Sequence, residues 1–280
     1  MCAKMPAGPP QIFDESLLHV RERRAARRVE RRGESFLLRR VADDLAERMA
    51  DVNRDFERML LVAPEGTVVE GLPADTVVRK PSEHTRLGLE AGGFDIAAAL
   101  LGPGQVNDLP GALIEMRRAL RPDGLLMAAM FGGETLKELR AALYADDTAR
   151  RGGVSARVHP TVGHVEAAGL LGRAGLALPV VDFDRFIVRY GDLRTLVEDL
   201  RDIGLSNALT SRDGGWLGRG ALERIAAHYP VEDGKFPATF EVLWLTGWAP
   251  HESQQVPLRP GSAKMRLADA LGVPEGKLEP

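Results

Sequence analysis

The chain has 280 residues and a formal net charge of -3 at pH 7. That length is sufficient for a full hydrophobic core, and the balanced charge gives no basic field that would predict a nucleic-acid partner. The single cysteine, Cys2, excludes a disulfide framework and a cysteine-ligated zinc or iron–sulfur site. No apolar run reaches about 18 residues and the first residues hold no secretory segment, so we expect a cytoplasmic protein without a transmembrane segment.

Two helices are predicted at the start of the chain. Residues 13–32 are dense in arginine and are most simply a solvated helix, although such a run could also grip an acidic partner or a membrane surface. Residues 35–52 carry an apolar stripe at helical spacing, formed by Leu38, Val41, Leu45 and Met49. These helices precede the first strand, which we place at residues 59–63.

The segment after the first strand is short of helix-forming sequence. It reads Pro64-Glu65-Gly66-Thr67-Val68-Val69 before a second predicted strand at residues 75–80. Arg79 and Lys80 close that strand, and residues 81–93 leave no room for a further helix and strand before the buried strand at 97–101. The first half of the predicted sheet is therefore abbreviated.

Residues 108–143 have the alternation of a doubly wound α/β sheet. Asp108 is expected to cap a helix at residues 109–120, and Pro122 and Gly124 then reverse the chain, with Gly124 expected to take positive φ. An uncharged apolar strand follows at 125–130, and after Gly132 and Gly133 a helix is predicted at 134–143. Residues 144–153 are expected to be a polar connection.

The last part of the chain adds further helices and two strands. Helices are expected at 165–172, 192–208 and 221–229, and strands at 178–188 and 236–248. His159 and His164 have no second ligand at metal-binding spacing, so a surface or capping role is favoured. His251 and Glu252 are adjacent, and adjacent side chains seldom converge on one iron. No metal site is therefore expected.

Several motifs carry a family resemblance. The run LPGALIEMRRALRPDG resembles class I S-adenosylmethionine-dependent methyltransferases. The runs IFD near the start, AMFGGETLKELRAAL, and GWAPHESQ with a later GSA resemble a narrower methyltransferase-like family. That family includes the mitochondrial complex I assembly factor regarded as a protein-arginine hydroxylase, and its α-proteobacterial relatives.

The resemblance implies a Rossmann-like methyltransferase fold with one structural domain overall. Its expected parts are an N-terminal helical extension at 1–54, the core at 55–190, a helical insertion at 191–233, and a final strand with an irregular tail at 234–280. It also implies S-adenosylmethionine as cofactor, with Pro64, Glu65, Gly66 and Leu101 at its site.

The chain departs from the family where the cofactor should bind. The family has a glycine-rich turn after the first strand and a carboxylate after the second, because the backbone must pass close to the cofactor and a carboxylate accepts both ribose hydroxyls. Pro64 replaces a glycine, Arg79 and Lys80 replace the carboxylate, and Glu83 is a possible later substitute. We therefore predict that S-adenosylmethionine does not bind in the usual way, which leaves open whether the chain retains catalysis.

The resemblance further implies a protein that binds or modifies a peripheral-arm subunit of respiratory complex I. Arg201, Asn207, Arg212 and Arg219 lie in the insertion that covers the cleft in such proteins and are candidates for holding a carboxylate or an acidic protein surface; plain solvation and loop anchoring is the alternative. Two other functions stay open, a working methyltransferase with an atypical loop and the malonyl-carrier-protein methyltransferase of biotin synthesis.

Overall fold

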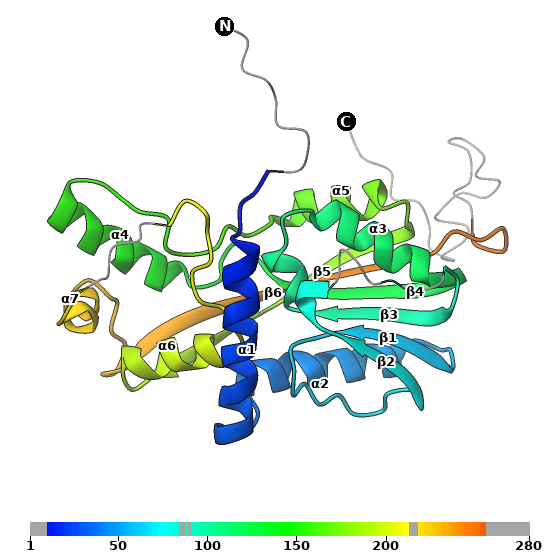
Figure 1. Ribbon diagram of the computed structural model, residues 1–280, viewed down its shortest axis with the longest axis horizontal. Helices are drawn as coiled ribbons and strands as arrows, with labels where there is room; N and C mark the ends of the chain where they lie inside the picture. The colour runs from blue at the N-terminus through cyan, green and yellow to red at the C-terminus, as the bar shows by residue number, and fades with distance from the viewer. Residues whose placement is uncertain (1–9, 84–87, 89–90, 213–217, 256–280) are drawn as a thin grey trace, which may run out of the picture. The chain divides into compact units, whose positions relative to one another are not determined.

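The computed structural model describes residues 10–83, 88, 91–212 and 218–255. It divides into a unit of Met1–Pro250 and a unit of His251–Pro280, of which residues 251–255 are described. The helices and strands labelled in Figure 1 belong to the first unit.

The described strands form one six-stranded sheet in the order β2-β1-β3-β4-β6-β5. The pairs that join β2, β1, β3 and β4 are parallel, and β6 runs antiparallel to both β4 and β5. This order confirms the mostly parallel, doubly wound sheet expected for the methyltransferase fold. The strands are β1 (Arg58–Val62), β2 (Asp75–Arg79), β3 (Phe94–Leu100), β4 (Leu120–Phe131), β5 (Ala177–Tyr190) and β6 (Phe236–Trp248).

Helices cover both faces of this sheet (Figure 1). Successive strand side chains point to opposite faces, so Leu61 packs in one core cluster and Leu60 in the other. The predicted stripe of α2 (Phe36–Asp51) is buried in the first cluster. The second cluster is closed by α3 (Leu109–Ala119) and α5 (His164–Arg173).

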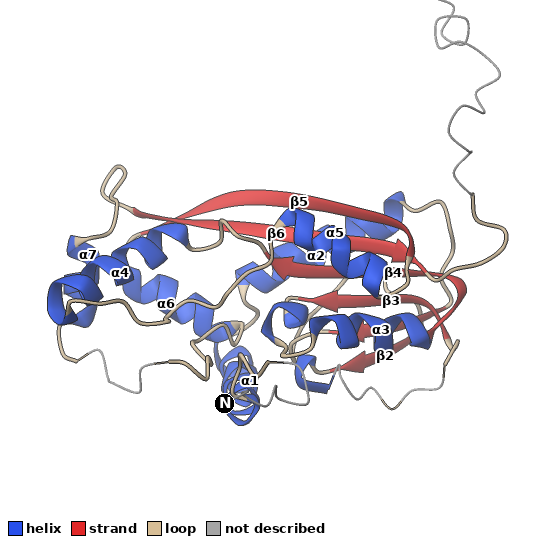
Figure 2. Ribbon diagram, turned by 90° about the horizontal axis from the view of Figure 1, so that it is seen from above, coloured by secondary structure: helices blue, strands red, loops and turns tan. Residues whose placement is uncertain are grey.

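In the sequence, the helical insertion lies between β5 and β6, the two long antiparallel strands. Figure 2 shows the β5–β6 pair extending toward α4, α6 and α7. Here α6 spans Leu193–Asp202 and α7 spans Ala221–Ala227. The N-terminal α1 (Glu15–Arg32) packs against α6, with Ala25 buried and Arg32 Nη1 2.8 Å from Glu198 Oε2. The extension and the insertion therefore stabilise each other.

Helix α4 spans Lys137–Arg151, so the polar connection predicted at residues 144–153 is wrong. The helix continues past Leu143 because its buried face is completed by Asp146 and Asp147, whose charges are paired with arginine. Asp147 is fully buried and accepts two 2.6 Å hydrogen bonds from the guanidinium of Arg157, and Asp146 accepts one of 3.1 Å from Arg224. Apolar periodicity cannot reveal a helical face whose buried positions are ionic.

The chain reversal predicted at residues 121–124 lies within β4 and also differs in detail from the prediction. Asp123 takes the positive φ, at 62°, and Gly124 does not. Gly124 is required for space instead, because a Cβ there would lie 2.9 Å from the Arg121 carbonyl oxygen and 3.1 Å from that of Asp95. The reversal therefore depends on both residues, for different reasons.

A single carboxylate ties together the amino ends of the parallel strands. Asp95 is 5% exposed and accepts hydrogen bonds from the amides of Glu57 (2.7 Å) and Arg58 (2.9 Å). Arg121 Nη1 lies 2.7 Å from its other oxygen. One side chain thus connects the starts of β1, β3 and β4.

The sheet ends at β2 in the part of the chain that the structure describes. Between β2 and β3 the described residues form one short 3₁₀ turn, Pro81–Glu83, and no strand. Val78 on β2 is 56% exposed. This arrangement agrees with the abbreviated first half that the sequence predicts.

Candidate functional site

A cavity of about 310 Å³ lies at the carboxyl ends of β1 and β3. The chain leaves β1 toward β2 on one side and reaches β3 on the other, and ligands of open α/β sheets bind at such a switch point. Pro64 and Glu65 line it from the loop after β1, and Leu101 lines it from the loop after β3. Helix α1 forms the opposite wall.

The loop after β1 is a tight turn that α1 covers. Thr67 donates hydrogen bonds to the Pro64 carbonyl from its amide (3.2 Å) and its hydroxyl (2.6 Å). Gly66 has φ +84°, and a Cβ there would lie 2.7 Å from Cγ1 of Val29 on α1. Among the described residues, no helix separates this turn from β2. The glycine backbone is therefore approached closely by a side chain of the protein itself.

Basic residues occupy the end of β2. Lys80 Nζ lies 2.8 Å from Glu65 Oε2, so the carboxylate predicted in the cofactor loop is paired with the lysine that follows β2. Arg79 closes the strand, and the side chain of Glu83 lies outside the described part of the structure. Of the four predicted cofactor residues, Pro64, Glu65 and Leu101 line this cavity, and Gly66 lines a shallow pocket beside it.

Two carboxylates of α1 line the cavity and were missed by sequence reasoning. Glu22 accepts hydrogen bonds from the hydroxyl (2.6 Å) and amide (3.4 Å) of Ser82, and Glu15 accepts one of 3.1 Å from Asn107. Neither glutamate forms an ion pair with a basic side chain that the structure describes. Their spacing of seven residues, which puts both on one helix face, was the available signal.

Asp108 also lines the cavity, and its predicted capping role is confirmed. Its carboxylate accepts a 2.9 Å hydrogen bond from the amide of Gly111 in the first turn of α3. The cavity wall therefore carries several acidic side chains, of which those on α1 retain free acceptor capacity.

A second, mostly apolar cavity of about 500 Å³ shares Leu101 and Asn107 with the first. His159 lines it and is 8% exposed, so the expected surface position is wrong. Its Nε2 accepts a 3.1 Å hydrogen bond from the Ala208 amide, and its Nδ1 has no partner among the described residues. Burial lowers the pKa of His159 to about 4, which keeps the ring neutral near pH 7.

Three of the four residues predicted to bind a substrate or partner, Arg201, Asn207 and Arg212, lie near Arg21, whereas Arg219 lies beside α7. The Asn207 carbonyl accepts from Arg21, and the Asn207 side chain donates to the Ala156 carbonyl at 2.8 Å. Arg212 donates to the Leu209 carbonyl at 2.8 Å and to Asp14 at 3.1 Å, which anchors the start of α1. Arg201 is exposed at the α1–α6 junction, and Arg219 is exposed beside α7.

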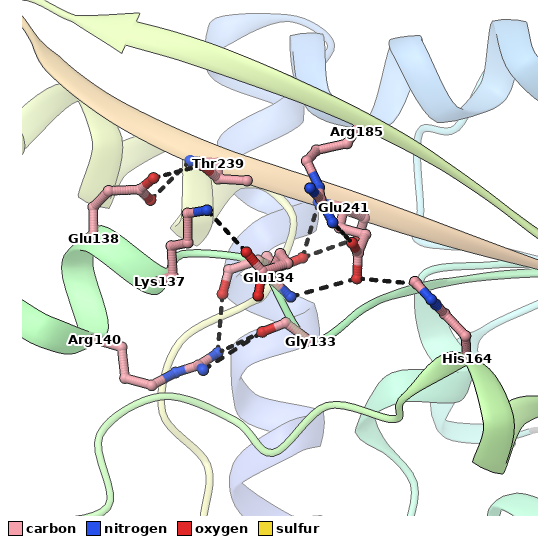
Figure 3. A network of polar contacts seen from close by, with 10 residues as sticks. Gly133, Glu134, Lys137, Glu138, Arg140, His164, Arg185, Thr239 and Glu241 are labelled. Atoms are coloured by element: carbon pink, nitrogen blue, oxygen red, sulfur yellow. Dashed lines mark hydrogen bonds and ion pairs between the residues drawn. The ribbon is translucent and has the colours of Figure 1, made fainter.

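A buried carboxylate organises the turn between β4 and α4 (Figure 3). Glu241 on β6 is 1% exposed; its Oε2 lies 2.6 Å from Arg185 and its Oε1 3.5 Å from Nε2 of His164. The Glu134 amide donates to Glu241 at 3.4 Å. A glutamate inside an aromatic, β-branched strand was the sequence signal for this network.

The described residues contain neither a candidate metal site nor a candidate membrane-spanning helix. They contain no group of three or more His, Cys, Asp or Glu side chains that could hold a metal ion. No helix among them is both long enough and apolar enough to cross a membrane. His251, in the second unit, contacts Ser253, with its Nδ1 2.7 Å from the hydroxyl oxygen.

Comparisons with known proteins identify the family. No family model matches the chain. The mitochondrial arginine-hydroxylase NDUFAF5 of Danio rerio is 31% identical over 299 residues, covering 96% of this chain and 91% of that protein. A malonyl-[acyl-carrier protein] O-methyltransferase of Methylovorus is 37% identical over 178 residues, 61% of this chain and 57% of that protein. Among solved structures, the YcgJ protein of Bacillus subtilis has a TM-score of 0.47 at 12% identity, covering 76% of this chain and 99% of that one. By the identity and coverage of the first relative, the chain belongs to the arginine-hydroxylase NDUFAF5 family.

Proposed function

We propose that this protein assists the assembly of respiratory complex I by binding an arginine side chain of a peripheral-arm subunit. The binding site is the cavity at the carboxyl ends of β1 and β3, called the acidic cavity because Glu15, Glu22 and Asp108 line it. The observation that carries the proposal is the presence of Glu15 and Glu22, without basic partners among the described residues, at the switch point of the sheet. A guanidinium donates paired hydrogen bonds to carboxylates and remains charged at all physiological pH values. The relatives are named arginine hydroxylases, which also supports arginine as the side chain that this protein binds.

The proposal includes a loss of the usual S-adenosylmethionine site. That cofactor requires a carboxylate after the second strand, and a glycine turn leading into a helix whose N-terminus faces it. Arg79 and Lys80 stand at the first position, and Val29 of α1 lies against Gly66 at the second. The residues present therefore do not fit the cofactor in its usual pose.

Isothermal titration tests the cofactor part. We expect no binding heat for S-adenosylmethionine or S-adenosylhomocysteine up to millimolar concentration, and no rise in melting temperature. A methyltransferase with an intact glycine loop, titrated under the same conditions, is the positive control. Micromolar binding, about -8 kcal/mol, would overturn this part and favour the second candidate, a working methyltransferase with an atypical loop. The cavity at the switch point is the observation that favours that candidate.

Complementation tests the binding part. In a strain lacking the gene, we expect reduced NADH:quinone oxidoreductase in the membranes, restored by the wild-type chain. Glu22→Gln keeps a group that can accept from Ser82 but removes the charge, and it should not restore the enzyme. Glu223→Gln, an exposed change on α7, is the matched control and should restore it. Full restoration by Glu22→Gln would contradict the proposal.

A further inference from the structure

A groove lined by arginine lies on the other side of α1 from the acidic cavity. Six arginines line it: Arg21, Arg24, Arg27, Arg28, Arg31 and Arg201. Arg21, Arg24, Arg28 and Arg31 follow steps of three and four and so share one face of α1, while Arg201 comes from the end of α6. In Figure 1 one end of α6 reaches α1, and the two helices pack together. We call this feature the arginine groove; its cavity measures about 720 Å³.

The positive charge of the arginine groove is only partly neutralised. Arg28 pairs with Asp202, and Arg21 donates to the Asn207 carbonyl. The guanidinium groups of Arg24, Arg27 and Arg201 form no hydrogen bond or ion pair with any residue that the structure describes. Glu30 is the one acidic residue among the described residues that line the groove. Arg24, Arg27 and Arg201 are therefore held in one groove without an ion-pair partner in the described part of the chain.

The neighbouring cations of the groove repel one another. The pKa of the Arg21 guanidinium is lowered, first by burial and then by the charges of Arg212, Arg24 and Arg201. Such repulsion is relieved when an anion binds, because the anion is attracted by all of these charges at once. The groove therefore favours the binding of negatively charged ligands.

The shape and lining of the groove indicate which anion fits. From Arg21 to Arg31 the helix rises about 15 Å, which matches about five residues of an extended peptide. A helix that binds a bilayer needs an apolar face to insert, and the lining here is arginine, glutamate, glycine and serine. Single-stranded nucleic acid is bound with aromatic stacking platforms, and no aromatic residue that the structure describes lines the groove.

We propose that the arginine groove is a docking site for a short, extended acidic segment of a partner protein. Carboxylates spaced along such a segment would pair with Arg24, Arg27 and Arg201, which do not have to leave an existing partner. The site is separate from the acidic cavity, so this inference holds whether or not the cavity binds arginine. A protein partner could then contact α1 on two faces of opposite charge.

Fluorescence anisotropy with the full chain tests the proposal. The probe is a labelled peptide of alternating Asp and Glu, and the same peptide with Asn and Gln is the neutral reference. The groove variant combines Arg24→Gln, Arg27→Gln and Arg201→Gln. The control variant combines Arg23→Gln, Arg173→Gln and Arg194→Gln, three exposed arginines outside the groove, so that both variants lose the same net charge.

We expect the wild type and the control variant to bind the acidic peptide with similar affinity, and the groove variant to bind at least about tenfold more weakly. Binding should also weaken as salt is added, because the contacts are charge pairs near the surface. Unchanged melting temperatures would show that both variants are folded.

Three outcomes would overturn the proposal. The first is no binding of the acidic peptide up to millimolar concentration. The second is equal weakening in both variants, which would assign the effect to net charge alone. The third is a preference of the wild type for vesicles of phosphatidylcholine and phosphatidylserine, or for a single-stranded oligonucleotide, over the peptide.

Discussion

His159 is a side chain whose chemistry is set by burial. It lies between Phe13, whose ring centroid is 5.0 Å from its own in an edge-on contact, and the Ala208 amide that donates to it. Burial lowers its pKa from 6.5 to about 4, so the folded protein takes up a proton on this ring only in acid. The ring is therefore a neutral hydrogen-bond acceptor that joins the segment before α5 to the insertion.

This shift predicts a pH-dependent stability. The unfolded chain protonates the histidine near pH 6.5, and the folded chain does so near pH 4. The contribution of His159 is complete above pH 6.5 and is lost as the pH falls toward 4, by about 3 kcal/mol of unfolding free energy. Urea unfolding curves measured between pH 4 and 7 would show this loss, and His159→Asn should flatten it. His228→Asn, an exposed histidine change, is the control; parallel curves for His159→Asn and the wild type would contradict the assignment.

At the scale of the secondary-structure elements, the junction between β4 and α4 contains the pair Gly132 and Gly133, which differ in the space available for a side chain. A Cβ on Gly132 would lie 2.4 Å from Oε1 of the buried Glu241, whereas a Cβ on Gly133 would meet nothing within 4 Å. The first glycine makes room for the carboxylate that Arg185 and His164 hold, and the second does not.

Gly132→Ala should therefore destabilise the protein, by about 2 kcal/mol, because Glu241 must move away from its partners. Gly133→Ala is the matched control and should change the unfolding free energy by less than about 1 kcal/mol, since neither glycine has positive φ. Chemical denaturation of both variants measures the difference. Equal effects would mean that the close approach at Gly132 is relieved without cost.

The elements differ in how far the sequence predicts them. Apolar periodicity predicts α2, α3 and the buried strands, because their inner faces are uniformly apolar. It fails for the second half of α4, where the buried residues are Asp146 and Asp147, which pair with Arg224 and Arg157 outside the helix. Buried charged side chains leave no apolar period in the sequence.

On the scale of the whole molecule, the sequence predicts the mostly parallel, doubly wound sheet better than the candidate site. Motif spacing predicts the parallel strands and the abbreviated region after β2. It does not predict that α1 lies over the switch point, because the packing of α1 on α6 and Gly66 is tertiary. The acidic cavity and the arginine groove both depend on that packing.

The end of the sheet at β2 predicts uneven protection of the backbone. All seven residues of β3 are buried, whereas the residues of β2 are exposed or half-buried. We expect hydrogen–deuterium exchange to be slowest in β3 and β4 and much faster in β2, because an edge strand opens without global unfolding. Mass spectrometry of peptic peptides measures this order. Protection of β2 equal to that of β3 would contradict it.

Asp95 gives the two ends of the sheet different tolerance to mutation. It fastens the amino ends of β1, β3 and β4, while the carboxyl ends of β1 and β3 open into the acidic cavity. Substitutions at the carboxyl end of the sheet can therefore leave this framework intact. In a library of variants, changes at Asp95 should reduce the amount of protein in the cell. Changes at Glu22 should leave that amount unaltered and, on the proposed function, lower the amount of NADH:quinone oxidoreductase, so protein abundance distinguishes the two ends.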